Sequence, residues 1–90
     1  MRTIEVRLIN RSGLHARPAV RFVQLAMKLT SSIMICKESS CVNAKNVLKV
    51  LSPGIDYGDL IIIKTDGSDE DEALKHLLDP IQNVLPGEDR

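Results

Sequence analysis

The chain has 90 residues, 43% of them hydrophobic, and its twelve basic side chains equal its twelve acidic ones. A chain of this length buries only roughly 60 to 65% of its unfolded surface, so we expect one domain, residues 1–90, without a large internal cleft. Zero net charge provides no long-range attraction to nucleic acid or to an anionic membrane. Recognition of a partner must therefore depend on local features.

No apolar run approaches the roughly 20 residues that cross a bilayer, and the N-terminal residues lack the apolar stretch of a signal peptide. We expect a cytoplasmic protein without membrane insertion. Cys36 and Cys41 are too few for a disulfide framework or a four-ligand zinc site. We expect both to be reduced packing residues that lie opposite each other in a hairpin, and we expect no metal site and no cofactor.

Apolar and polar residues alternate over residues 3–8, which predicts a strand with one buried face. Residues 16–29 then place apolar side chains three and four apart, as in an amphipathic helix. Pro18 lies in the first turn of this helix, where a missing N–H costs nothing. These two elements predict a helix that packs on one face of a sheet.

Two short apolar runs, residues 32–37 and 41–43, predict a hairpin. Asn46 precedes a further apolar segment, residues 47–51, whose ends resemble the N-cap and the stop of a helix. The β-branched valines of this segment leave its type open.

Isoleucines between turn-forming sequences predict a strand over residues 60–65. Ser68 or Asp69 is the predicted N-cap of a last helix, whose first turn is rich in acidic residues. Pro80 removes a backbone donor, so we expect a kink or an end near Asp79. The order βαββαβα predicts an α+β fold, an open-faced two-layer β-sandwich in which three helices cover one face of a four-stranded antiparallel sheet.

The segment 13–19 reads Gly-Leu-His-Ala-Arg-Pro-Ala, where the first loop meets the first helix. If His15 is the N-cap, the amides of Ala16 and Arg17 have no intrahelical partners and form an anion site beside an imidazole. Arg17 adds a guanidinium suited to phosphate oxygens, and neutral histidine is a competent nucleophile near pH 7. A lone histidine at a helix start is also typical of an ordinary capping or surface residue, and the residues alone leave both interpretations open.

The same segment resembles the active-site motif of HPr, the histidine-containing phosphocarrier family of the phosphoenolpyruvate-dependent sugar phosphotransferase system. Residues 42–55 resemble that family's second helix region, and the likeness extends from Thr3 to about Leu85. The resemblance implies that enzyme I, charged by phosphoenolpyruvate, phosphorylates His15 on Nδ1 and that sugar-specific IIA components accept the group. The protein would be a carrier that acts through phosphohistidine rather than an independent catalyst.

The resemblance also implies roles for other residues. Arg17 would assist transfer, and Ser12 with the amides of Ala16 and Arg17 would border the phosphate. The face that docks both partners would comprise Val20, Gln24, Met27, Val47, Leu48, Lys49 and Leu51. Core packing is an equally good interpretation of each apolar member. Lys28, Lys45 and Lys49 would add a local basic rim, although a solvated face is the simpler interpretation of any one lysine.

Asn46 departs from the family pattern, since many members carry there a serine that a dedicated kinase phosphorylates. Asparagine caps a helix as well as serine does but has no hydroxyl, so we expect the helix to persist and this regulation to be absent. Two other functions stay open: a regulatory HPr-like binding module, and a specialised carrier outside sugar uptake that serves a nitrogen branch or a dihydroxyacetone kinase. One tyrosine and one phenylalanine provide no stacking platform for bases, so we expect no nucleic-acid partner, and we expect a monomer.

Overall fold

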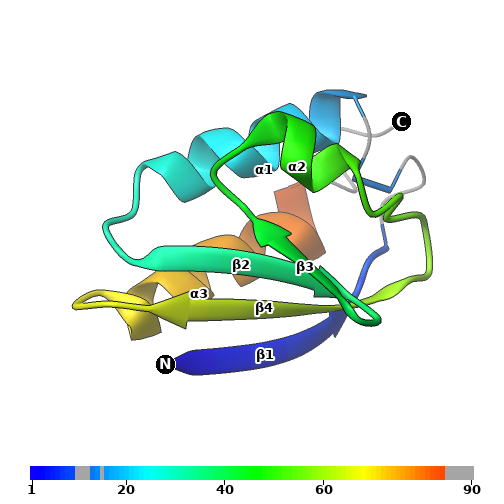
Figure 1. Cartoon of the computed structure of the whole chain (residues 1–90). Helices are drawn as coiled ribbons and strands as arrows, with labels where there is room; N and C mark the ends of the chain where they lie inside the picture. The colour runs from blue at the N-terminus through cyan, green and yellow to red at the C-terminus, as the bar shows by residue number, and fades with distance from the viewer. Residues whose placement is uncertain (10–12, 15, 85–90) are drawn as a thin grey trace.

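The strands and α-helices follow one another along the chain in the order β1, α1, β2, β3, α2, β4, α3 (Figure 1). The computed structural model describes residues 1–9, 13–14 and 16–84. The bounds of the elements are β1 Arg2–Arg7, α1 Ala16–Met27, β2 Ser32–Lys37, β3 Ser40–Asn43, α2 Val47–Leu51, β4 Leu60–Asp66 and α3 Glu70–Asp79. Among the described residues, no helix is long and apolar enough to cross a bilayer.

The four strands form one antiparallel sheet in the order β1-β4-β2-β3. Ile63 of β4 lies between Ile4 of β1 and Ile35 of β2, and Ile35 faces Val42 of β3. These four side chains belong to the core cluster or pack against it, so they share one face of the sheet. The helices cover one face of the sheet (Figure 1). The predicted open-faced sandwich is therefore confirmed.

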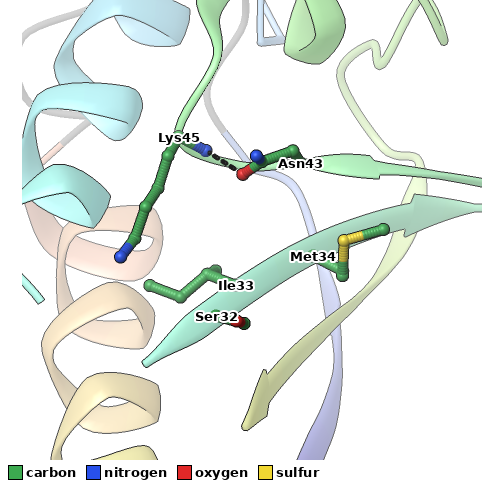
Figure 2. Close-up of a pocket in the computed structure, with 5 residues that line it drawn as sticks. All are labelled: Ser32, Ile33, Met34, Asn43 and Lys45. Carbon is green, nitrogen blue, oxygen red and sulfur yellow. Dashed lines mark hydrogen bonds between the residues drawn. The ribbon is translucent and has the colours of Figure 1, made fainter. Parts of the chain in front are cut away.

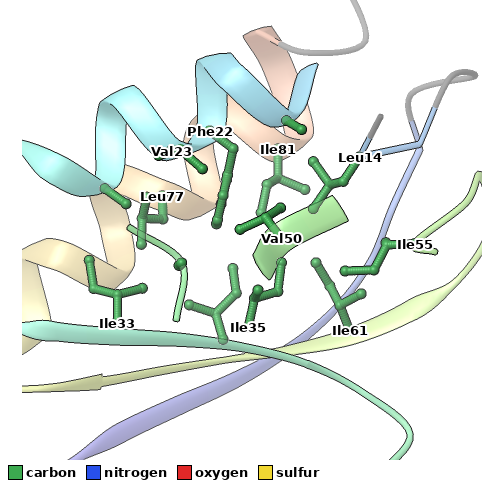
Figure 3. Packing of buried hydrophobic residues seen from close by; sticks show 14 of the residues in the cluster. Leu14, Phe22, Val23, Ile33, Ile35, Val50, Ile55, Ile61, Leu77 and Ile81 are labelled. Atoms are coloured by element: carbon green, nitrogen blue, oxygen red, sulfur yellow. The ribbon is translucent and has the colours of Figure 1, made fainter. Parts of the chain in front are cut away.

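The core lies between this face and the helices (Figure 3). Phe22 of α1 and Leu77 of α3 are fully buried against Ile33 and Ile35 of β2. α2 is too short to be stable alone, so its one fully buried residue, Val50, fixes it to the same core. The core thereby fixes the positions of α1 and α2 relative to each other, and the two helices are in contact.

The predicted helix over residues 47–51 is confirmed as α2. The Asn46 side chain accepts a hydrogen bond from the Lys49 backbone N–H at 3.2 Å, as an N-cap does. The predicted break at Pro80 is also confirmed, because α3 ends at Asp79 and a single π-helical turn, Pro80–Val84, follows.

The prediction for the α3 N-cap is correct in position but wrong in chemistry. Asp69 is the N-cap residue, yet its side chain makes no capping bond. Its carboxylate accepts hydrogen bonds from the backbone N–H and hydroxyl of Thr30, at 3.0 and 2.8 Å, and from the same two groups of Ser31. Hydrogen bonds to the ionised form, first that from the Ser31 hydroxyl, hold the pKa of Asp69 well below its usual value.

The expectation that the cysteines are reduced is wrong. Cys36 and Cys41 occupy directly opposite positions in the β2–β3 ladder, as predicted, and their sulfur atoms form a disulfide bond. Opposite residues of an antiparallel pair bring their side chains within bonding distance, and sequence spacing alone does not reveal whether such a pair is oxidised.

Candidate functional site

α1 begins at Ala16, so residue 15 immediately precedes the helix, as predicted. The predicted nucleophile His15 and the predicted phosphate neighbour Ser12 lie outside the described residues. The amides of Ala16 and Arg17 belong to the first turn of α1, where backbone N–H groups have no intrahelical acceptor. The Arg17 side chain is exposed, and Pro18 is buried. An exposed cation and backbone donors without intrahelical acceptors therefore lie at the positive end of α1.

The two residues before position 15 fix where α1 begins. Gly13 has φ 65°, and a Cβ atom there would lie 2.7 Å from the Cα of Asp56. Leu14 donates its backbone N–H to the Ile55 carbonyl at 2.9 Å, and both side chains point into the core (Figure 3). The start of α1 is thereby held against the segment that follows α2.

The end of β2 holds in place the segment that follows α2. The Lys37 ammonium donates to the Gly54 carbonyl at 2.9 Å and pairs with the Asp59 carboxylate at 2.7 Å. The hydrogen bond between Lys37 and Asp59 raises the pKa of Lys37 and lowers the pKa of Asp59. Asp59 also accepts the backbone N–H of Asp56 at 2.7 Å. Nothing in the sequence pattern identified Lys37 as a residue that positions the site.

The predicted docking face lies on α1 and α2. Val20, Met27 and Leu48 have exposed fractions of 41%, 64% and 77%, which is unusual for large apolar side chains. The face also includes the exposed residues Gln24 and Lys49. Val47 and Leu51 are half-buried and pack against the core, so the core-packing interpretation holds for part of their surface.

The charged side chains on the two helices of this apolar face are all basic, since α1 and α2 contain no acidic residue. Arg17, Arg21 and Lys28 are exposed on or just after α1, and Lys49 is exposed on α2. Lys45 differs, because its ammonium donates to the carbonyl of Leu29, two residues after the end of α1, at 2.7 Å. The local charge of the face is therefore positive although the chain is neutral overall.

A hollow of about 200 Å³ lies beside Lys45 (Figure 2). Its lining residues are Ser32, Ile33, Met34, Asn43 and Lys45. A second hollow, at the start of α3, is lined by Ser68, Asp69, Asp71 and Glu72 and would repel an anion. Neither of these two hollows is lined by the described residues at the start of α1.

Comparisons with known proteins agree with this geometry. The family described as PTS HPr component phosphorylation site matches residues 2–83. The phosphocarrier protein HPr of Buchnera aphidicola is 41% identical over 73 residues, which are 81% of this chain and 86% of the relative. The HPr-like protein Crh of Halalkalibacterium halodurans is 44% identical over 75 residues, 83% of this chain and 87% of the relative.

Solved structures show the same fold. HPr from Thermoanaerobacter tengcongensis superimposes with a TM-score of 0.93 at 39% identity, covering 100% of both chains. An HPr dimer from the same organism superimposes with a TM-score of 0.75, covering 94% of this chain and 98% of that one. By sequence and by structure, this chain belongs to the HPr family of the phosphotransferase system.

Proposed function

We propose that this chain is a single-domain cytoplasmic phosphocarrier that accepts a phosphoryl group from enzyme I on His15 and donates it to sugar-specific IIA components. The observation that supports this most directly is the start of α1 at the residue after His15. A nucleophile at this position is next to the backbone donors and the positive end of the helix. Membership of the HPr family adds the phosphoryl chemistry.

In the proposed transfer, a lone pair of neutral His15 attacks the phosphorus as its bond to the donor breaks. The amides of Ala16 and Arg17, with Ser12 beside them, border the phosphoryl oxygens, and the Arg17 guanidinium neutralises charge that spreads over them. Transfer to the acceptor reverses the same steps. The chain needs no deep cleft, because its partner completes the site at the moment of transfer.

The docking face is consistent with a site that a partner completes. An exposed apolar centre with a basic rim, on helices without acidic residues, suits partners that present an apolar patch with acidic surroundings. We propose that Val20, Met27 and Leu48 are the central contacts. Gln24, Val47, Lys49 and Leu51 complete the same surface.

Asn46 is proposed to remove one form of regulation. Its side chain caps α2, as a serine at this position would, but it has no hydroxyl to receive a phosphate. Incubation with an HPr serine kinase and ATP should leave residue 46 unmodified. An Asn46→Ser variant, which keeps a capping side chain, should become a substrate, and phosphate on wild-type residue 46 would contradict the proposal.

The decisive experiment is incubation with enzyme I, magnesium and phosphoenolpyruvate, followed by intact-mass measurement. Wild type should gain about 80 Da, the mass of one phosphoryl group, and lose it in acid. His15→Ala should gain nothing, whereas His76→Ala, the matched control at the second histidine, should gain the same mass as wild type. No gain in wild type with an active enzyme I would refute the carrier function.

A second candidate function is a regulatory HPr-like binding module, which the 44% identity to an HPr-like protein Crh favours. Phosphotransfer would then be secondary to binding by the docking face. The mass experiment bears on this alternative, because no gain with an active enzyme I would leave the binding module as the better interpretation. We propose a monomer, and light scattering tests this against the dimer found for the HPr of Thermoanaerobacter tengcongensis.

A further inference from the structure

We propose that Cys36 and Cys41 form a reversible thiol–disulfide pair that controls the mobility of α2 and, through it, partner affinity. The effect on affinity rests on the function proposed above, whereas the effect on α2 does not. In the cytoplasm, the location proposed above, most disulfides are transient or redox-sensing, so a disulfide there points to a regulated bond.

The position of the bond makes it accessible from one side. β3 is an edge strand, and Cys41 on it is exposed, whereas Cys36 is 2% exposed. Cys36 pairs with Ile62 in the ladder, one residue away from the core-facing Ile61 and Ile63, so the disulfide lies on the open face of the sheet. An external thiolate can therefore approach the Cys41 sulfur without disturbing the core.

The exchange is a two-step displacement by a dithiol reductant. One reductant thiolate attacks Sγ of Cys41, the S–S bond breaks, and Cys36 leaves as a thiolate that takes up a proton. The second reductant thiolate then displaces Cys41, which also ends as a thiol. Two electrons pass to the protein, and the reductant becomes a disulfide.

The hairpin depends on this bond more than most hairpins would. Its two-residue turn, Glu38–Ser39, contains neither glycine nor asparagine, and Glu38 has φ 55°, in the left-handed region that glycine favours. β3 has four residues only. Reduction removes a covalent link next to a strained turn, so the free hairpin opens more often.

Both ends of α2 are attached to this hairpin. At the first end, the side chain of Asn43, at the end of β3, accepts the Lys45 backbone N–H at 2.9 Å (Figure 2). The backbone carbonyl of Asn43 accepts the N–H of Asn46, the α2 N-cap. At the other end, Lys37, the neighbour of Cys36, donates to the carbonyl of Gly54 just after α2. Opening of the hairpin therefore loosens α2 from both sides.

The test compares the oxidised protein with protein reduced by dithiothreitol or by a thioredoxin-class dithiol protein. Reduction should add about 2 Da, two hydrogen atoms, under conditions in which the fold persists. Amide hydrogen exchange should then accelerate about threefold or more at Ala44, Val50 and Gly54. The N–H of Ala44 forms a hydrogen bond before α2, that of Val50 forms one within it, and that of Gly54 forms one after it. The amide of Ala73 in α3 should be unchanged.

Cys41→Ser is the matched control, because residue 41 is exposed and the change removes the bond without opening the core. Its exchange should equal that of reduced wild type and should not respond to reductant. Any one of three results would overturn the proposal. These are a disulfide bond that resists both reductants, equal amide exchange in the oxidised and reduced wild type, and an equal acceleration of exchange at Ala73.

Transfer from enzyme I provides the functional readout. The KM of enzyme I should be about threefold higher or more for the reduced form than for the oxidised form, because docking must then order α2. An unchanged KM would overturn the link to affinity. If neither form accepts phosphate, the proposed function fails, while the exchange comparison still decides whether the pair controls α2.

Discussion

The α1–α2 side and the α3 end of the molecule use charge in opposite ways. On the first side, exposed cations accompany exposed apolar residues, and α1 and α2 have no acidic residue. At the other end, the first turn of α3 holds Glu70, Asp71 and Glu72, and the start of the chain engages two of these acids. The Met1 ammonium pairs with Glu70 at 3.0 Å, and Arg2 pairs with Asp71 at 2.5 Å.

This difference suggests separate purposes: the α3 end serves stability, and the α1–α2 side serves recognition of a partner. Side chains at the α3 end bind other parts of the same chain, as Asp69 does with Thr30 and Ser31. Apolar side chains on the α1–α2 side are exposed at a cost in solvation, which a docking partner would recover. Substitutions at the α3 end should therefore change stability, and substitutions on the docking face should change partner affinity.

The largest expected effect on stability is at Gly13, which lies just before α1, where the α1–α2 side is held against the rest of the fold. Gly13→Ala adds a Cβ at positive φ and within 2.7 Å of the Asp56 Cα, so unfolding in urea should show a loss of about 2–4 kcal/mol. Gly54→Ala is the matched control, since Gly54 has φ 67° and a Cβ atom there would meet nothing within 4 Å. It should lose only about 1–2 kcal/mol. Equal losses would show that the close approach to Asp56 does not matter.

Asp69 should have the next largest effect, and its effect should depend on pH. Asp69→Asn removes a charged acceptor of four hydrogen bonds, so the Tm at pH 7 should fall by several degrees. The pKa of Asp69 is lower in the folded than in the unfolded protein, so its stabilisation is present above the unfolded pKa and is lost as the pH falls.

Thermal unfolding followed by circular dichroism checks this dependence. The Tm difference between wild type and Asp69→Asn should shrink as the pH falls below about 5. A difference that is constant down to pH about 2 would contradict the assignment.

Leu48 tests the other side of the comparison. Because its side chain is 77% exposed, Leu48→Asp should change stability by less than about 0.5 kcal/mol. The KM of enzyme I for this chain should nevertheless rise about tenfold, because an acid replaces a residue that we propose as a central apolar contact. Leu60→Asp is the control, since Leu60 is 44% exposed on the open face of the sheet. A similar rise in KM for Leu60→Asp would show that the effect is not specific to the docking face.

Most of the fold was predictable because it depends on short-range patterns. The isoleucines of β4 predicted a strand, Asn46 predicted the start of α2, and Pro80 predicted the end of α3, since each depends on local backbone chemistry. The use of the Asp69 side chain was not predictable. Its partners lie 38 and 39 residues away, and local rules assigned the carboxylate to its own helix.

The start of α1 at the candidate site was predictable and is confirmed, its anion-binding chemistry stays a prediction, and its support was not predictable. The pattern from Gly13 to Pro18 indicated an anion site, because a helix start has free donors wherever it occurs. By contrast, the contacts of Leu14 with Ile55 and of Lys37 with Gly54 join distant segments, and no sequence spacing reports them. The oxidation of Cys36 and Cys41 is a further case, because their register was predictable and their bond was not.

The smallest expected effect concerns the ion pair of Arg2 with Asp71, whose side chains are 60% and 65% exposed. An exposed pair gains little Coulomb energy in water and loses side-chain entropy, so Arg2→Gln and Asp71→Asn should each cost less than about 0.5 kcal/mol in urea unfolding. The coupling energy from the double-variant cycle should vanish at about 1 M salt, where the Debye length is near 3 Å. A coupling energy above about 1 kcal/mol that persists in salt would mean that the α3 end is stabilised by its surface ion pairs as well as by the Asp69 hydrogen bonds.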